Sequence, residues 1–238
     1  MPLLSIIQGA ALRCNLKVPA QAFSSTDENV LQLIAFAEDS GRELVERGDW
    51  NELKVKATVT GDGVSTIFAL PSDWMRLCPS DKSPVGALVS LSRPTIPLRG
   101  PVNDEALNQI KALTAFPAYP VWRFVNRNLE IWPALADSEV VSFWYFTRAW
   151  VISPQGIQST RFTSDNDASL IDEDLIMKGA IWKWKRAKGL DYQEEYATYE
   201  REFGRLAGQQ DNSRVISTST ITTVDDTFWP GQITYTPL

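Results

Sequence analysis

The sequence predicts an α+β fold, in which an antiparallel helical bundle is interrupted by a small inserted β domain and followed by an extended C-terminal tail. Three observations predict this fold. Apolar residues recur at helical spacing near both ends of the chain that precedes Asp211, they alternate with polar residues in the middle, and no helical period remains afterwards. We therefore expect residues 1–52 and 165–210 to form the helical domain, residues 53–164 the β domain and residues 211–238 the tail.

Two helices are expected before residue 52. The first covers residues 3–14, whose apolar side chains share one helical face. The second follows a capping pattern made by Ser25 and Glu28, and it ends near Gly48. Such a pair needs partners that cover its apolar faces, and the two helices expected late in the chain can provide them.

The middle of the chain predicts two β-hairpins. Residues 53–70 contain an alternating stretch, a turn signal at Gly61 and Gly63, and a second β-prone stretch, which together indicate the first hairpin. Residues 121–132 indicate the second, with its turn at residues 126–128.

Three further segments complete the expected β domain. Residues 103–113 follow a glycine and a proline and predict a short helix. Residues 140–151 predict a long aromatic strand, and the polar, turn-rich residues 153–167 predict a linker that returns to the helical domain.

Two helices joined at Gly189 are expected over residues 169–209, with Ser169 and Asp172 in the first N-terminal cap. The first of these helices has two apolar edges. One edge is broad, and the other is formed by Ile171, Leu175 and Trp182. Because a surface helix needs one buried stripe, we expect the second edge to contact a neighbouring subunit. A deep position within the chain's own bundle explains the second edge as well.

The tail, residues 211–238, carries too little apolar surface to fold on itself. We expect it to bind a partner as an extended strand. Its apolar anchors are Val215, Ile221, Val224, Phe228, Trp229, Ile233 and Tyr235.

Composition excludes several classes of function. The 238 residues carry 29 acids and 23 bases, and this formal charge of −6 disfavours a protein that coats nucleic acid. The chain has no histidine, which removes Ser/His/Asp and Cys/His catalysis and the HExxH metal motif. Cys14 and Cys78 belong to no metal motif and are expected to be buried free thiols. We expect no cofactor and no metal.

No membrane segment or export signal is expected. No apolar run reaches the roughly 18 residues that a membrane-spanning helix needs. The first 15 residues lack the basic start and the cleavage pattern of a signal peptide, so synthesis inside a cell without export by that route is expected.

Four stretches resemble, in order, the head-to-tail adaptor proteins of short-tailed bacteriophages, which are also called tail accessory or head completion proteins. They are GRELVERGDWNEL, FALPSDWMRL, IPLRGPVNDEALNQIKA and DEDLIMKGAIWKWKRAKGLDYQEEYATYERE. None is a catalytic signature, so the combination carries the resemblance, and it covers most of residues 1–205.

The resemblance implies a structural virion protein rather than an enzyme. Such proteins form a ring of about twelve copies between the capsid portal and the tail or nozzle, and genomic DNA passes through the ring without sequence-specific binding. The expected location is the virion neck, after synthesis in the host cytoplasm. The expected partners are further copies of the chain, the portal protein, and nozzle or other tail proteins, with the tail residues above on the portal.

Two other functions stay open at this point. A tail-associated peptidoglycan hydrolase would use acids such as Glu194 and Glu195, although adjacent helical residues face different directions. A carbohydrate-binding β module would use exposed tryptophans on the strands. Its candidates are Trp122, Trp132, Trp144 and Trp150.

Overall fold

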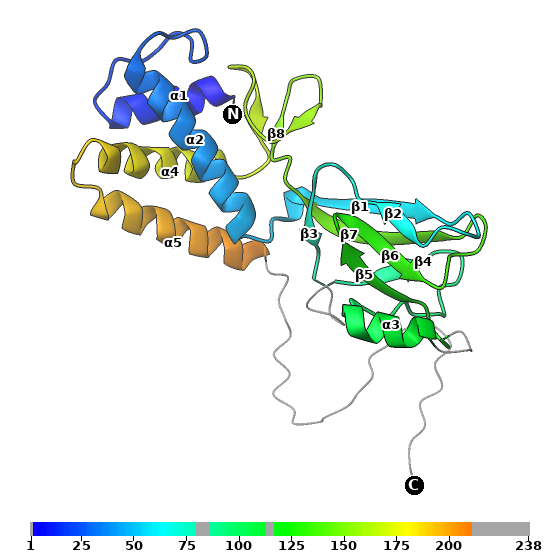
Figure 1. The fold of residues 1–238 in the computed structure, drawn as a ribbon. Helices are drawn as coiled ribbons and strands as arrows, with labels where there is room; N and C mark the ends of the chain where they lie inside the picture. Colours follow the sequence, from blue (N-terminus) through cyan, green and yellow to red (C-terminus); the bar gives the residue numbers. More distant parts are fainter. Residues whose placement is uncertain (1, 80–85, 113–116, 211–238) are drawn as a thin grey trace.

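The computed structural model describes residues 2–79, 86–112 and 117–210. In these ranges the longer helices gather at one end of the molecule and most strands at the other (Figure 1). The helices are α1 (Leu3–Arg13), α2 (Glu28–Arg47), α3 (Asp104–Ala112), α4 (Glu173–Ala187) and α5 (Gln193–Gln210). The longer strands are β1 (Lys54–Thr60), β5 (Val121–Val125), β6 (Asn128–Trp132) and β7 (Val140–Thr147). The predicted α+β class is confirmed, while the division into domains at the expected boundaries stays a prediction.

The ends of the helices follow local capping chemistry. Helix α2 is capped by Asp27, whose carboxylate accepts the N–H of Asn29 at 2.9 Å. The expected capping residue, Ser25, instead accepts the N–H of Asp27 at 3.1 Å, so the predicted box lies two residues too early. Asp27 is the capping residue because it follows the turn at Ser25 and its carboxylate lies next to the first free amides of the helix.

The junction between α4 and α5 is formed as predicted. Gly189 has a φ of +69°, and the N–H of Leu190 donates to the carbonyl of Lys185 at 2.9 Å, which is the Schellman ending of a helix. At the other end, Asp172 alone caps α4 by accepting the N–H of Leu175 at 2.9 Å. Ser169 lies in the short strand β10 (Ala168–Ser169).

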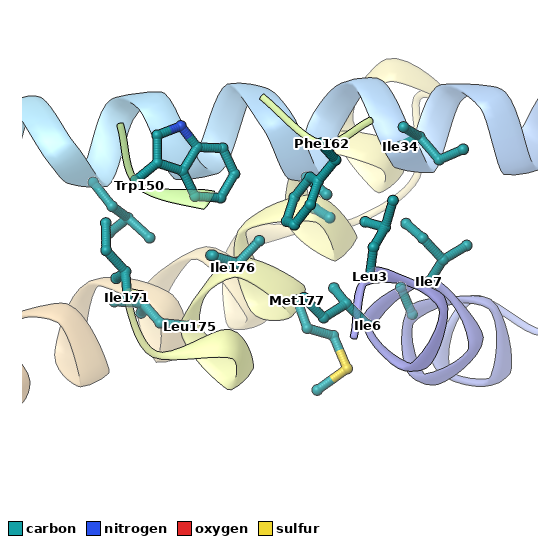
Figure 2. Packing of buried hydrophobic residues seen from close by; sticks show 14 of the residues in the cluster. Leu3, Ile6, Ile7, Ile34, Trp150, Phe162, Ile171, Leu175, Ile176 and Met177 are labelled. Carbon is teal, nitrogen blue, oxygen red and sulfur yellow. The ribbon is translucent and has the colours of Figure 1, made fainter. Parts of the chain in front are cut away.

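Side chains of α1, α2 and α4 form the main core, and buried aromatic residues from outside the α-helices, among them Trp150 and Phe162, complete it. Trp150 and Phe162 pack edge to face, with ring centroids 4.9 Å apart, against α2 (Figure 2). Close around them lie apolar residues of α1 and α4. The residues labelled in the same view are Leu3, Ile6, Ile7, Ile34, Ile171, Leu175, Ile176 and Met177.

The segment expected to be a linker, residues 153–167, is therefore part of the helical core. It contains β9 (Gln158–Ser159), which joins β8 (Val151–Ile152) and β10 in a three-stranded sheet. The carboxylate of Asp165 accepts the N–H groups of Ala22 and Phe23 and ties this sheet to the loop before α2. Strands of two residues are too short to show a period, so the sequence pattern could not indicate them.

Two sheets enclose a second core at the other end of the chain. One has the order β1–β7–β3, and β4 (Leu88–Ser90) also pairs with β7 beyond β3 (Trp74–Leu77). The other has the order β2–β6–β5, with β2 spanning Ile67–Ala69. Apolar residues of both sheets meet in the second core, for example Leu129, Ile131 and Val141.

The predicted first hairpin is wrong, although both of its strands exist. β1 pairs with β7 from Lys54 opposite Phe146 to Thr60 opposite Val140, whereas β2 pairs with β6 in the other sheet. The turn at Gly61 therefore crosses between sheets instead of closing a hairpin. A side chain on Gly61 would overlap with the carbonyl of Ala136, so this crossing needs glycine.

The second hairpin and the short helix are confirmed, whereas the aromatic strand predicted over residues 140–151 ends at Thr147, and Val151 begins β8 of another sheet. β5 and β6 form the second hairpin, in which Asn126 and Arg127 have φ values of 47° and 61°, as a two-residue turn between twisted strands requires. The short helix is α3, and the long aromatic strand is β7. Helix α3 lies against the smaller sheet, where Lys111 contacts the buried Glu130 at 2.6 Å.

Close contact between α2 and α4 generates a test of the main core. A methyl group on Gly179 would overlap with Ser40 of α2, because the two helices approach at this point. We expect Gly179→Ala to lower the free energy of unfolding by about 1–3 kcal/mol, measured by urea denaturation.

Gly204→Ala is the matched control, since Gly204 lies within α5 and nothing would meet its added methyl group. It removes a flexible residue from a helix and should raise stability by up to about 1 kcal/mol. Equal effects of the two changes would contradict close packing at Gly179.

Candidate functional site

Helix α4 lies between α5 on one side and the α1–α2 pair on the other (Figure 1). Both of its apolar edges are covered by the same chain. Its buried residues are Leu175, Ile176, Met177, Gly179, Ala180, Ile181, Trp182 and Trp184. This central position is the alternative that the sequence left open for the second edge.

The three residues expected at a subunit contact are all buried within the chain. Ile171 and Leu175 belong to the main core and are 2% and 0% exposed. Trp182 is 8% exposed and packs against three tyrosines of the α5 region, with ring centroids 5.1 to 6.3 Å away. A role for these residues between subunits stays a prediction, because folding of the single chain already accounts for their burial.

A cluster of charged side chains fastens α2, α4 and α5 together near Trp182. The guanidinium of Arg47 on α2 contacts both carboxylate oxygens of Glu200 on α5, at 2.9 and 2.7 Å. The same guanidinium donates to Glu43 at 2.9 Å, and Lys183 of α4 donates to the other oxygen of Glu43 at 2.8 Å. The paired geometry of Arg47 and Glu200 is the strong form of such a contact.

The cluster holds its carboxylates in the ionised form. The hydrogen bond from Arg47 lowers the pKa of Glu200 below its ordinary value, against a smaller effect of burial. Burial raises the pKa of Glu43, but hydrogen bonds from Lys183 and Arg47 outweigh it and leave that pKa lowered. Burial, together with the neighbouring Glu43, raises the pKa of Tyr199, which therefore stays neutral.

A surface pocket of about 620 Å³ opens beside this cluster. Its walls combine aromatic rings with charged groups from α2, α4 and α5. The lining residues are Glu43, Arg47, Trp182, Arg186, Tyr192, Gln193, Tyr196 and Glu200. Arg186 is exposed, and no ion pair joins it to an acid among the described residues. The pocket therefore presents a cation together with Tyr196, which is 42% exposed.

The acids that a hydrolase would use serve the fold instead. Asp172 caps α4, and Glu195 forms an ion pair with Lys185 across the α4–α5 junction. Glu194 lies in the first turn of α5, where a negative charge favours the helix. The geometry brings none of these acids together as an acid and base pair.

The four tryptophans considered for sugar binding do not share a surface. Trp122 and Trp150 are each 1% exposed and lie in different cores. Trp132 at the end of β6 is half-buried, with the Lys111 ammonium 5.4 Å from its ring centroid, and Trp144 on β7 is 53% exposed. A sugar platform needs rings that are exposed side by side, so this arrangement does not form one.

The described residues offer no metal site, no reactive thiol at Cys78 and no membrane-spanning helix. Within the described ranges, no group of three or more His, Cys, Asp or Glu side chains could hold a metal ion. Burial raises the pKa of Cys78 to about 11, so this thiol stays protonated, while Cys14 is only partly buried. None of the described helices has the length and apolar character needed to cross a membrane.

Sequence reasoning missed the charged cluster and could not place the tail. Glu43 and Arg47 are four residues apart on one helix, a spacing that indicates a pair, but nothing local indicates Glu200 as the second partner.

The predicted tail anchors lie outside the described residues. They are Val215, Ile221, Val224, Phe228, Trp229, Ile233 and Tyr235.

Comparison with known proteins identifies the family. A protein-family model described as SU10 adaptor protein matches residues 1–224. The chain therefore belongs to the SU10 adaptor protein family, which confirms the resemblance to bacteriophage head-to-tail adaptors. A search among curated proteins found no match.

The charged cluster generates a prediction for acid conditions. We expect Arg47→Gln to lower the free energy of unfolding by about 1–2 kcal/mol at pH 7, because the ion pairs are about one-third exposed. Since the pKa values of Glu43 and Glu200 are lowered in the folded chain, this contribution is fully present above the ordinary value of 4.5 and is lost as the pH falls through the lowered values. Urea denaturation of both proteins, from pH 7 down to below pH 4.5, measures this difference in the free energy of unfolding.

Arg42→Gln on the same helix is the control. Arg42 pairs with Asp39 on an exposed surface, so its removal should cost less than about 0.5 kcal/mol at any pH. A cost for Arg47→Gln that is equally large at pH 7 and in acid would refute the assigned role of the cluster.

Proposed function

We propose that this member of the SU10 adaptor protein family forms a ring of about twelve copies that joins the capsid portal to the tail or nozzle of a bacteriophage. The match of the family model over residues 1–224 is the observation that carries this proposal. The ring would lie in the neck of the virion, after synthesis of its subunits in the host cytoplasm. Its role is structural, and none of the side chains described above is assigned a catalytic task.

The contact between subunits would lie on the helical end of the molecule, at the pocket beside Trp182. Ile171 and Leu175 would support this contact by fixing α4, since they are covered within their own chain. The side of Trp182 that lines the pocket, together with the exposed Tyr196 and Arg186, would meet the neighbouring copy. Aromatic rings and arginine are the residue types that contribute most to protein interfaces.

The ring would also line part of the DNA channel. The chain carries a formal charge of −6, and weak attraction for phosphate suits a wall along which DNA must slide during ejection. No sequence-specific contact with the genome is needed for this function.

The tail, residues 211–238, would attach the ring to the portal through its apolar anchors. Ordering such a segment costs free energy, which the surface of the partner must offset. Phe228 and Trp229 are its largest neighbouring apolar side chains and are therefore the expected centre of the portal contact.

Native mass measurement tests the proposed function. The purified chain is measured alone and after addition of the portal ring of the same phage. Binding of multiple copies to one portal ring is the expected result. A chain that stays monomeric and does not bind the portal would overturn the adaptor proposal.

A change in the tail tests the portal contact. We expect Phe228→Ala combined with Trp229→Ala to weaken portal binding at least 30-fold, or about 2 kcal/mol, because buried aromatic residues dominate such contacts. Titration of the portal with the labelled variant measures this loss. Thr227→Ala, the neighbouring control, should bind within a few-fold of the original chain, and equal affinity of all three proteins would exclude this part of the tail from the contact.

A further inference from the structure

β1 is an edge strand with an open side. It pairs with β7 along one side, and among the described residues nothing pairs with the other. The N–H of Gly61 donates to the carbonyl of Glu139 at 2.7 Å. Because hydrogen-bonded pairs alternate along an antiparallel ladder, the backbone N–H and C=O groups of the odd-numbered residues of β1 face β7. The N–H groups of Lys56, Thr58 and Thr60 therefore point away from the sheet.

This open edge is regular enough to accept another strand. β1 keeps one register with β7 over seven residues, without a bulge, and it contains no proline. Natural edge strands are commonly protected by bulges, prolines or charges, and here the only charges are Lys54 and Lys56 at one end. The inward side chains Val55, Ala57 and Val59 stay half-buried at the margin of the second core, so an added strand would also cover them.

The chain leaves its last described helix beside the start of β1. The side chain of Gln210 accepts the N–H of Asn51 at 3.1 Å and donates to Glu52 at 3.1 Å. Asn51 also donates to the carbonyl of Gln210 at 3.3 Å. Asn51 and Glu52 belong to the short helix η1 (Asn51–Leu53), which directly precedes β1. The segment after Gln210 therefore starts at the same end as β1.

The sequence after Gln210 suits pairing with this edge. Residues 214–224 read RVISTSTITTV, in which eight of eleven residues are β-branched and none is glycine or proline. Such residues favour strands, and eleven of them exceed the seven-residue length of β1.

We propose that, in the free subunit, residues 214–224 pair with the outer edge of β1 of the same chain as a parallel strand. The direction follows from the common starting end. The pairing requires neither the portal nor the ring, so it stands apart from the proposed function. In the free subunit the pairing would occupy three of the proposed portal anchors, Val215, Ile221 and Val224, and would leave residues 225–238, with Phe228 and Trp229, available for a partner.

Amide hydrogen exchange of the full chain, resolved by residue with NMR, tests the proposal. The variant carries Thr220→Pro and Ile221→Pro. Successive amides of a strand point to opposite sides, so this pair of changes removes a donor toward β1 in any register. The exchange of Lys56, Thr58 and Thr60 should become at least about tenfold faster in this variant.

Two controls accompany the measurement. The amides of Val55, Ala57 and Val59, which face β7, should exchange equally slowly in both proteins. A second variant with Gln232→Pro and Ile233→Pro, outside the pairing segment, should leave the outward amides of β1 as slow as in the original chain.

Three outcomes would overturn the proposal. Fast exchange of the outward amides in the original chain would mean that the edge is free, and slow exchange in the Thr220→Pro, Ile221→Pro variant would mean that other residues cover it. Protection that grows with protein concentration would assign the strand to a second copy. None of these outcomes depends on portal binding, so failure of the adaptor proposal is observed separately.

Discussion

The rest of the structure depends on the close packing of α4 against α2. Glycine at position 179 lets the two backbones approach, and the apolar residues of α4 then fill the space between α1, α2 and α5. The strands of the second core are attached to α2. Arg76 of β3 donates to the carbonyl of Gly48 at the end of α2 at 2.7 Å, and its guanidinium lies 4.8 Å from the ring centroid of Phe146. A shift of α2 would therefore move both cores.

Both apolar packing and ion pairs hold α5 against α2 and α4. Its only fully buried side chain is Tyr199 among the residues that the structure describes, so apolar packing alone holds this helix weakly. The paired contact of Arg47 with Glu200 adds a directional constraint, and Arg47 also lies 4.2 Å from the ring centroid of Phe203. Partial exposure keeps the cost of desolvating these charges small. The pocket beside Trp182 follows from this arrangement, because helices held through long side chains leave space between them.

The sequence predicted the elements better than their partners. Helical periods and capping residues located all the long helices to within a few residues, because those signals are local. Pairing of β1 with β7 joins residues 80 to 92 positions apart, and only the fit of two long strands decides it. Phe162 and Trp150 were missed as core residues for a related reason, since their partner α2 lies far away in sequence. The burial of Trp182 within its own chain could not be told from a subunit contact, because both require the same apolar edge.

When an open strand edge and a β-prone segment belong to one chain, the covalent link between them favours their pairing over pairing with another molecule. In the proposed pairing, a linker of a few residues after Gln210 would keep residues 214–224 near β1 at a local concentration on the order of millimolar, which a strand from another molecule in dilute solution does not reach. Pairing within the chain also avoids the loss of translational and rotational freedom that association of two molecules incurs. An uncovered regular edge is a template for aggregation. In the proposed pairing, the same segment would protect the edge in the free subunit. Because parallel pairing is slightly less stable per residue than antiparallel pairing, a larger surface that competes for the segment would release it.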